Sequence, residues 1–167
     1  MFTSYKKHKN KLYNSLVKLS RNNFFYQDMN LDDKLETRVY LIFFHFAFIL
    51  RATKLQKREK ESQEVFDNIF QNIEYNLREL GDGDVSVNKK MKKLTRVFYD
   101  ILLNLDKKDS NQNNNIIYLI EKYFMIDKKK DTVNIKEFCD YFSKFQNFCF
   151  DLDVKNMLNG SFNLKYK

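Results

Sequence analysis

Side chains capable of acid–base, nucleophilic or metal chemistry are few in this chain. His8 and His45 are the only histidines, and Cys139 and Cys149 are the only cysteines, with no CxxC spacing. The sequence contains no Walker loop, GxGxxG, HExxH or GxSxG motif. It therefore predicts no catalytic residue, no metal site, no cofactor and no small-molecule substrate.

Residues 127–138 have a superficial likeness to a calcium-binding loop. Lys129 occupies a ligand position, Thr132 stands where the loop needs glycine, and Glu137 falls one residue too early. A calcium site is therefore not expected there.

The histidine and the cysteines have simpler structural explanations. His45 lies in the middle of an apolar run, where a histidine is usually a core residue hydrogen-bonded to a neighbour. Cys139 and Cys149 lie in an aromatic stretch, where free cysteines act as small buried apolar residues.

The charge is strongly basic, with a formal net charge of +8 and a pI of about 9.3. A basic surface can bind nucleic acid, anionic lipid or an acidic protein. Only six of the 30 basic residues are arginine, and Lys, Asn, Ile and Phe are abundant throughout. Such a profile also results from AT-rich codon usage, so charge alone leaves these partner classes open.

The composition favours an all-α fold. The 167 residues include 17 Phe and 10 Tyr but no Pro and only three Gly, too few turn formers for a sandwich or barrel of short strands. The size is that of one domain. The expectation is a single compact domain, residues 1–167, of about six helices.

Apolar residues at helical spacing mark these helices. Two Asp or Asn residues with Glu three positions later predict capping boxes, namely Asp33 with Glu36 and Asn134 with Glu137, and Asn88 is a further predicted N-cap. The tail after Asn159 is expected to fray. The predicted helices span residues 5–19, 33–55, 66–80, 88–105, 116–126 and 134–148.

Polar or aromatic stretches are expected to separate these helices. Residues 24–26 form an aromatic connector, residues 57–64 a polar bend, and residues 107–115 an Asn-rich loop without any apolar side chain. None of these stretches resembles a linker between domains.

The apolar run at residues 39–50 is too short to cross a membrane. It has 12 residues between two arginines, whereas a span needs about 20. A helix buried on nearly all sides is predicted instead. Residues 1–20 are Lys-rich and free of acid, like a transit peptide. With no secretory signal, the expected location is cytoplasmic, with peripheral contact at the bacterial inner membrane.

Two basic or acidic clusters could serve a partner. Gly81 to Asp84 fits a helix-ending turn with Gly81 at positive φ, or else a rigid knuckle on which a partner docks, and local physics favours the turn. The run from Lys89 to Lys93 is either a solvated helix face or a binding patch.

The Gly81 turn belongs to a set of sequence blocks that resemble a known family. Residues 77–84 (LRELGDGD), the basic residues 87–93 and the pair Phe98–Tyr99 together resemble the signature of the ubiquinol-cytochrome c chaperone family. The block from Arg38 through His45 to Arg51 resembles that family's apolar helix with a central histidine, and Leu12–Tyr13, Leu16–Val17, Arg21 and Phe25–Tyr26 resemble its opening helix.

The resemblance covers residues 11–106, which places Leu12 onward in the folded domain and removes the transit-peptide interpretation. Residues 116–158 are less specific. Two positions depart from the family pattern: Asp100–Ile101 stand where Gly-Arg is usual, and Asn88 stands where Pro is common.

Membership would imply an all-α, non-enzymatic chaperone that binds newly made cytochrome b, or another bc1 subunit, and supports assembly of the ubiquinol-cytochrome c reductase (bc1) complex. In mitochondrial members it also implies association with a second small assembly factor and with the ribosome. The small size and the lack of a presequence indicate a bacterial member.

The chemistry expected of such a chaperone is surface complementarity: an exposed apolar groove rimmed by Lys, which would also attract anionic headgroups. Two alternatives are an RNA- or ribosome-binding basic helical module, and an enzyme with a closed cavity lined by carboxylates or Arg. Five residues of the family-like blocks are predicted to have a structural role: Arg38, His45, Gly81, Gly83 and Phe98. The candidate partner-binding residues are Arg78, Glu79, Asp82, Asp84, Lys89, Lys92 and Tyr99.

Overall fold

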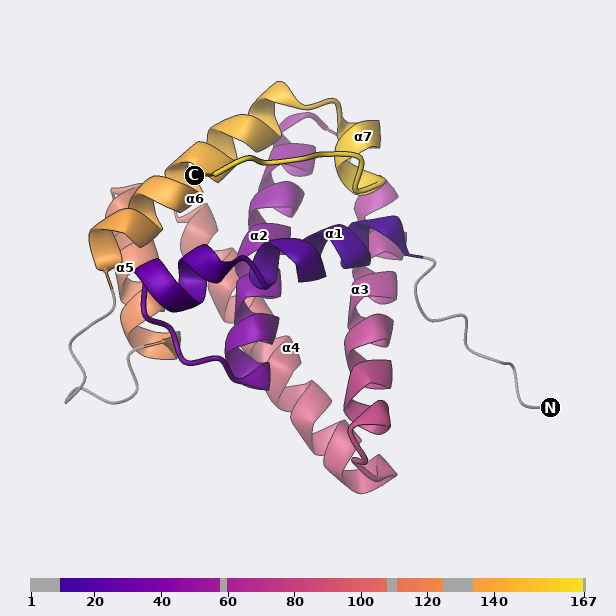
Figure 1. Ribbon diagram of the computed structural model, residues 1–167. Helices are drawn as coiled ribbons and strands as arrows, with labels where there is room; N and C mark the ends of the chain where they lie inside the picture. The colour runs from indigo at the N-terminus through magenta and orange to yellow at the C-terminus, as the bar shows by residue number, and fades with distance from the viewer. Residues whose placement is uncertain (1–9, 58–59, 108–110, 125–133, 167) are drawn as a thin grey trace.

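In a computed structural model, the chain is described over residues 10–57, 60–107, 111–124 and 134–166. These residues form seven α-helices, one short π-helix and no strand, which confirms the all-α prediction (Figure 1). In chain order the elements are α1 Lys11–Ser20, the π-helix η1 Phe24–Asp28, α2 Leu35–Leu55, α3 Lys60–Glu79, α4 Asp84–Asp106, α5 Gln112–Tyr123, α6 Ile135–Asp151 and α7 Val154–Leu158.

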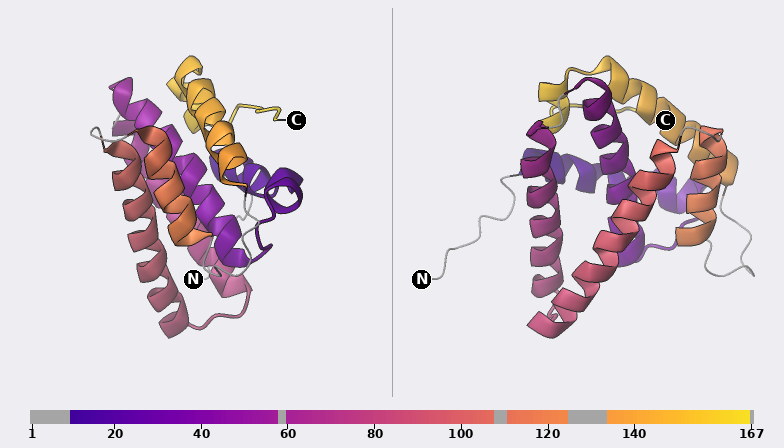
Figure 2. Two further views of the ribbon diagram at one scale, coloured as in Figure 1. Left: turned by 90° about the vertical axis from the view of Figure 1, so that its left-hand side faces the viewer. Right: turned by 180° about the vertical axis from the view of Figure 1, so that it is seen from behind.

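Helix α2 is the centre of the molecule. It lies between α4 and α5 on one side and α1 and α6 on the other, and its most extensive contacts are with α1, α4 and α6 (Figure 2). Every residue from Val39 to Ile49 is buried, as predicted for the apolar run. Among the described helices, none combines the length and hydropathy that crossing a bilayer requires.

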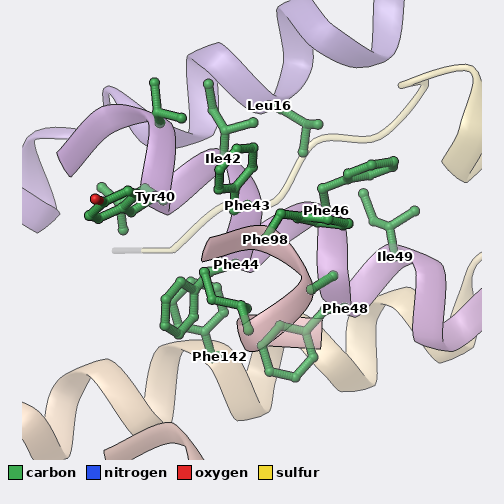
Figure 3. Packing of buried hydrophobic residues seen from close by; sticks show 14 of the residues in the cluster. Leu16, Tyr40, Ile42, Phe43, Phe44, Phe46, Phe48, Ile49, Phe98 and Phe142 are labelled. Carbon is green, nitrogen blue, oxygen red and sulfur yellow. The ribbon is translucent and has the colours of Figure 1, made fainter. Parts of the chain in front are cut away.

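The core around α2 is aromatic, and Phe98 of α4 lies at its middle. Its ring is 5.3 Å from that of Phe43 and 5.5 Å from that of Phe46 (Figure 3). The ring of Phe70 in α3 lies 5.4 Å away. Edge-to-face and stacked pairs at such distances add about 0.5–1.5 kcal/mol each to the burial of apolar area. The predicted structural position Phe98 therefore joins α2, α3 and α4.

The end of the chain packs against its beginning. Tyr166 is 9% exposed, and its ring lies 4.8 Å from Phe24 and 4.9 Å from Tyr141. Gly160 has φ of +67°, and a Cβ there would lie 2.6 Å from the backbone oxygen of Lys11. The prediction that the tail frays after Asn159 is therefore wrong, because the side chain of Tyr166 packs against Phe24 of η1.

Gly81 ends α3 as predicted. Its φ is +96°, its N–H donates to Arg78 O (3.0 Å), and the N–H of Asp82 donates to Leu77 O (3.3 Å). This pair of bonds is the Schellman motif, which satisfies the last carbonyls of a helix and needs a left-handed residue. The turn reverses the chain, so α3 and α4 form the hairpin seen at the bottom of Figure 1.

Several predicted helix ends are wrong for local reasons. Helix α2 begins at Leu35 without a side-chain cap, because the Asp33 carboxylate binds Arg38 instead (2.6 and 2.8 Å). Helix α4 begins four residues before Asn88, with Gly83 in the N-cap position. The predicted cap at Asn134 is confirmed, since its side chain accepts the Glu137 N–H (3.2 Å).

The predicted breaks are shorter than expected. Helix α3 already begins at Lys60, within the expected bend at residues 57–64, where Lys57 adopts φ of +58°. Helix α5 begins at Gln112 within the expected Asn-rich loop, capped by the Asn111 side chain. The expected aromatic connector is the π-helix η1, and α7 had not been predicted.

Candidate functional site

The described histidine is enclosed and fully hydrogen-bonded. Nδ1 of His45 is 2.6 Å from Leu41 O, and Nε2 is 2.7 Å from the Tyr141 hydroxyl oxygen. Because a carbonyl oxygen only accepts, Nδ1 donates and Nε2 accepts from Tyr141. Burial lowers the pKa of His45 to about 4, although the bond to Leu41 opposes that shift. This arrangement is the predicted core histidine, with no access for a substrate.

The thiols are equally inaccessible. Cys139 and Cys149 are free and buried, as predicted, and burial raises the pKa of each above its ordinary value. A raised pKa keeps a thiol protonated and unreactive. Within the described ranges, no group of three or more His, Cys, Asp or Glu side chains could hold a metal ion. Most of the calcium-like segment at residues 127–138 lies outside the described residues.

A groove lies between α1, the start of α2 and the last two turns of α3, with a volume of about 470 Å³. Its lining includes the apolar side chains of Val17, Ile42 and Ile73. Two leucines at its mouth face solvent: Leu35 is 41% and Leu80 is 66% exposed. The groove therefore combines an aliphatic floor with polar side chains, and the described chain leaves it open.

The polar residues of the groove come from the same three helices. The Tyr13 hydroxyl and Asn76 are hydrogen-bonded, which links α1 to α3. Arg38 extends over Asp33, and this hydrogen bond holds the pKa of the Asp33 carboxyl below its usual range. The cations among the lining residues are Arg21 and Arg38, and no lysine lines this groove. Glu79 also lines the groove.

Three further candidate residues lie at the turn between α3 and α4 and are engaged there. Arg78 pairs with Glu74 (2.9 Å) and with Asp84. Asp82 accepts from Lys90 (2.7 Å) and from Ser86 Oγ (2.9 Å), and these bonds lower its pKa. The geometry explains these side chains as parts of the turn, and a role in partner binding stays a prediction.

The last three candidates, Lys89, Lys92 and Tyr99, lie on the solvent-facing side of α4. The structure therefore places the predicted residues on three neighbouring surfaces instead of one. Within the basic run, Lys90 and Lys93 are ion-paired with Asp82 and Glu36, whereas Lys89 and Lys92 have no ion pair to a described residue.

Sequence reasoning missed three exposed residues on the same side of α4. Val85, Arg96 and Leu103 complete the row that Lys89, Lys92 and Tyr99 begin. The signal was available, because the six positions follow a 4-3-4-3-4 spacing along one helix face. The leucines of the groove mouth had no such signal, since their exposure depends on how three helices meet.

The five residues that were predicted to be structural have clear roles. Arg38 holds the segment before α2 through Asp33, and His45 and Phe98 lie in the core. Gly83 has φ of −74° and ψ of 167°, and a Cβ there would meet nothing within 4 Å, so α4 does not need glycine at that position. Gly81, by contrast, is required by its positive φ.

Comparisons with known proteins agree with this architecture. The chain resembles a crystal structure of the Cbp3 homolog from Brucella abortus, with a TM-score of 0.70 and 22% sequence identity over 93% of this chain and 87% of that chain. At that identity the likeness establishes a shared fold. A comparison with the curated proteins finds no match.

The family comparison reaches further. The model of the ubiquinol-cytochrome C chaperone family matches residues 27–164. The match includes the Gly81 turn, the central histidine and the helices after residue 106, which had no recognisable signature on their own. Most of the chain is covered by this match. The chain therefore belongs to the ubiquinol-cytochrome c chaperone family.

Proposed function

We propose that this protein is a non-enzymatic assembly chaperone that binds newly made cytochrome b during construction of the bc1 complex. Family membership supports a role in assembly of that complex. The observation that carries the finer proposal is the open groove between α1, α2 and α3, with its aliphatic floor and exposed leucines. Its occupant in this proposal is an apolar segment of cytochrome b that has not yet reached its final partners.

The physical case rests on the leucines at the mouth. Leu80 is 66% exposed and Leu35 is 41% exposed, beside a floor of buried aliphatic side chains. Removing apolar surface from water contributes about 25 cal/mol per Å². An apolar client segment would cover both leucines and extend the core, while Arg21, Arg38 and Glu79 at the rim remain hydrated.

The proposal of a non-enzymatic role is supported by the position of the reactive groups. His45 has both ring nitrogens occupied in the core, and both thiols are buried. The groove presents amide, hydroxyl, guanidinium and one carboxylate groups, with neither a thiol nor an imidazole among its lining residues. The two hydroxyls are engaged, Tyr13 with Asn76 and Ser20 with Val17 O. Such a surface holds a segment by shape and burial, without covalent chemistry.

The test is recovery of cytochrome b with the tagged protein from membranes of the native cell, with and without cytochrome b synthesis. We expect cytochrome b only when it is being made. Leu80→Gln should reduce the recovery strongly, whereas Leu55→Gln should not, because Leu55 is equally exposed (65%) but does not line the groove. Equal recovery with both variants would refute the groove as the binding site.

Association with a second assembly factor or with the ribosome, which the resemblance implies for mitochondrial relatives, has no surface assigned to it here.

A further inference from the structure

The solvent-facing side of α4 carries one straight row of exposed residues. Val85 is 85% exposed, Leu103 is 65% exposed and Tyr99 is 48% exposed. At 1.5 Å per residue the row is about 27 Å long. We call it the α4 stripe, and its members are Val85, Lys89, Lys92, Arg96, Tyr99 and Leu103.

The cations of the α4 stripe are uncompensated within the described chain. Lys89, Lys92 and Arg96 form no ion pair or hydrogen bond with a described residue, whereas Lys90 and Lys93 on the flank of the same helix bind Asp82 (2.7 Å) and Glu36 (2.9 Å). Three like charges at spacings of three and four residues repel one another and destabilise an isolated helix.

The nearest acid on α4 does not neutralise them. Asp100 accepts from Lys122 Nζ (2.8 Å) and from the Tyr123 hydroxyl (2.5 Å), so its carboxylate joins α4 to α5. The α4 stripe itself contains no acid. Its centre is therefore a concentrated positive charge, and its two ends are apolar.

We infer that the α4 stripe docks on the surface of a bilayer that contains anionic phospholipid. Lysine and arginine heads at its centre would contact lipid phosphates, each contributing a roughly fivefold increase in partitioning. Val85 and Leu103 would enter the interface between headgroups and acyl chains. Tyr99 has the amphipathic ring that is enriched at that depth.

Two other partners fit the stripe less well. A partner helix packed along the 4-3-4-3-4 row would need apolar side chains throughout the seam, but three successive positions here are charged and would be desolvated. Single-stranded RNA would account for the cations and for Tyr99 but not for the exposed Val85 and Leu103 at the two ends. A flat, hydrated anionic surface satisfies both kinds of residue.

The geometry leaves room for this contact. Helix α4 lies on the opposite side of α2 from α1, which forms one wall of the groove (Figure 2). A membrane against α4 would therefore not cover α1. The inference does not depend on the proposed client, because it concerns binding of the chain alone to lipid.

The experiment is flotation of the purified full-length protein with two kinds of vesicle. One kind is a two-to-one mixture of phosphatidylcholine and phosphatidylglycerol, and the other is phosphatidylcholine alone. We expect binding only to the mixed vesicles, weakening as salt is raised. Equal binding to both kinds, or binding to neither, would overturn the inference.

Matched variants locate the surface. The triple change Lys89→Gln, Lys92→Gln and Arg96→Gln should lower partitioning about 100-fold, since each cation contributes about fivefold. The control changes Lys11, Lys18 and Lys136, exposed residues of α1 and α6, to Gln and removes the same charge. The control should lose much less binding. Equal losses would show a diffuse charge effect and refute the α4 stripe.

Two further measurements separate the remaining explanations. The pair Val85→Ser and Leu103→Ser should lower vesicle partitioning about tenfold at high salt, where the apolar contribution dominates. Circular dichroism and thermal unfolding of each variant verify the fold. If the triple variant keeps its vesicle binding but loses binding to a single-stranded RNA, the stripe is an RNA surface and the membrane proposal fails.

Discussion

The buried pair of His45 and Tyr141 makes the stability of this protein sensitive to mild acid. In the folded chain the pKa of His45 is about 4, whereas an unfolded histidine titrates near 6.5. The unfolded state therefore binds a proton that the folded state excludes as the pH falls below 6.5. The contribution of this pKa difference to the free energy of unfolding is fully present above pH 6.5. It is lost progressively as the pH falls toward 4.

The size of this loss follows from the shift. Each unit of pKa difference corresponds to about 1.4 kcal/mol, so the full difference is roughly 3 kcal/mol. Between about pH 7 and pH 5 the expected loss is roughly 2 kcal/mol. The cause is burial of the ring, because the hydrogen bond from Nδ1 to Leu41 O favours the charged form and acts in the opposite direction.

Urea unfolding at the two pH values measures this loss directly. The matched control is the double variant His45→Leu with Tyr141→Phe, which removes the titrating group and its partner together and leaves no unsatisfied hydroxyl. The control keeps His8, so any contribution from that residue appears in both proteins. An unfolding free energy of the wild type that is flat across this range, or an equal slope in the control, would refute the assignment.

Three other substitutions test the core and the turn by thermal or urea unfolding. Tyr141→Phe alone leaves Nε2 of His45 without its donor and should cost about 1–3 kcal/mol; no loss would show that Nε2 needs no partner. Phe98→Ala should cost about 3–5 kcal/mol, since Phe98 is fully buried among three helices; a surface-like value would contradict its central position. Gly81→Ala should cost about 1–2 kcal/mol because of its positive φ. Gly83→Ala should cost less, about 0.5–1 kcal/mol, because its φ is ordinary and only its N-cap position disfavours alanine. A cost at Gly81 no larger than the cost at Gly83 would exclude the Schellman turn as the reason.

Local chemistry explains which parts of the fold the sequence predicts. Apolar periodicity locates most of the helices, and the position of Gly81 predicts its left-handed turn. A predicted helix start is wrong where another group binds the side chain that was expected to cap the helix. Arg38, for example, binds the carboxylate of Asp33. The tail was missed because Tyr166 is ordered by Phe24 and Tyr141, which are distant in sequence.

The candidate surfaces were predictable only in part. Lys89, Lys92 and Tyr99 could be placed on one face of α4 from their spacing. That Lys90 and Lys93 are paired while Lys89 and Lys92 are not depends on where Asp82 and Glu36 lie in the folded chain. The groove at Leu80 forms where α1, α2 and α3 meet, so no local sequence pattern predicts it.

The most direct test of the proposed function is site-specific photo-crosslinking in the native cell while cytochrome b is being made. A photoreactive phenylalanine analogue replaces Leu80 in one protein and Leu55 in another, two positions with the same exposure of which only Leu80 lines the groove. We expect a crosslink to cytochrome b from position 80 and none from position 55. Crosslinks to cytochrome b from position 55 alone, or equally from both positions, would contradict it.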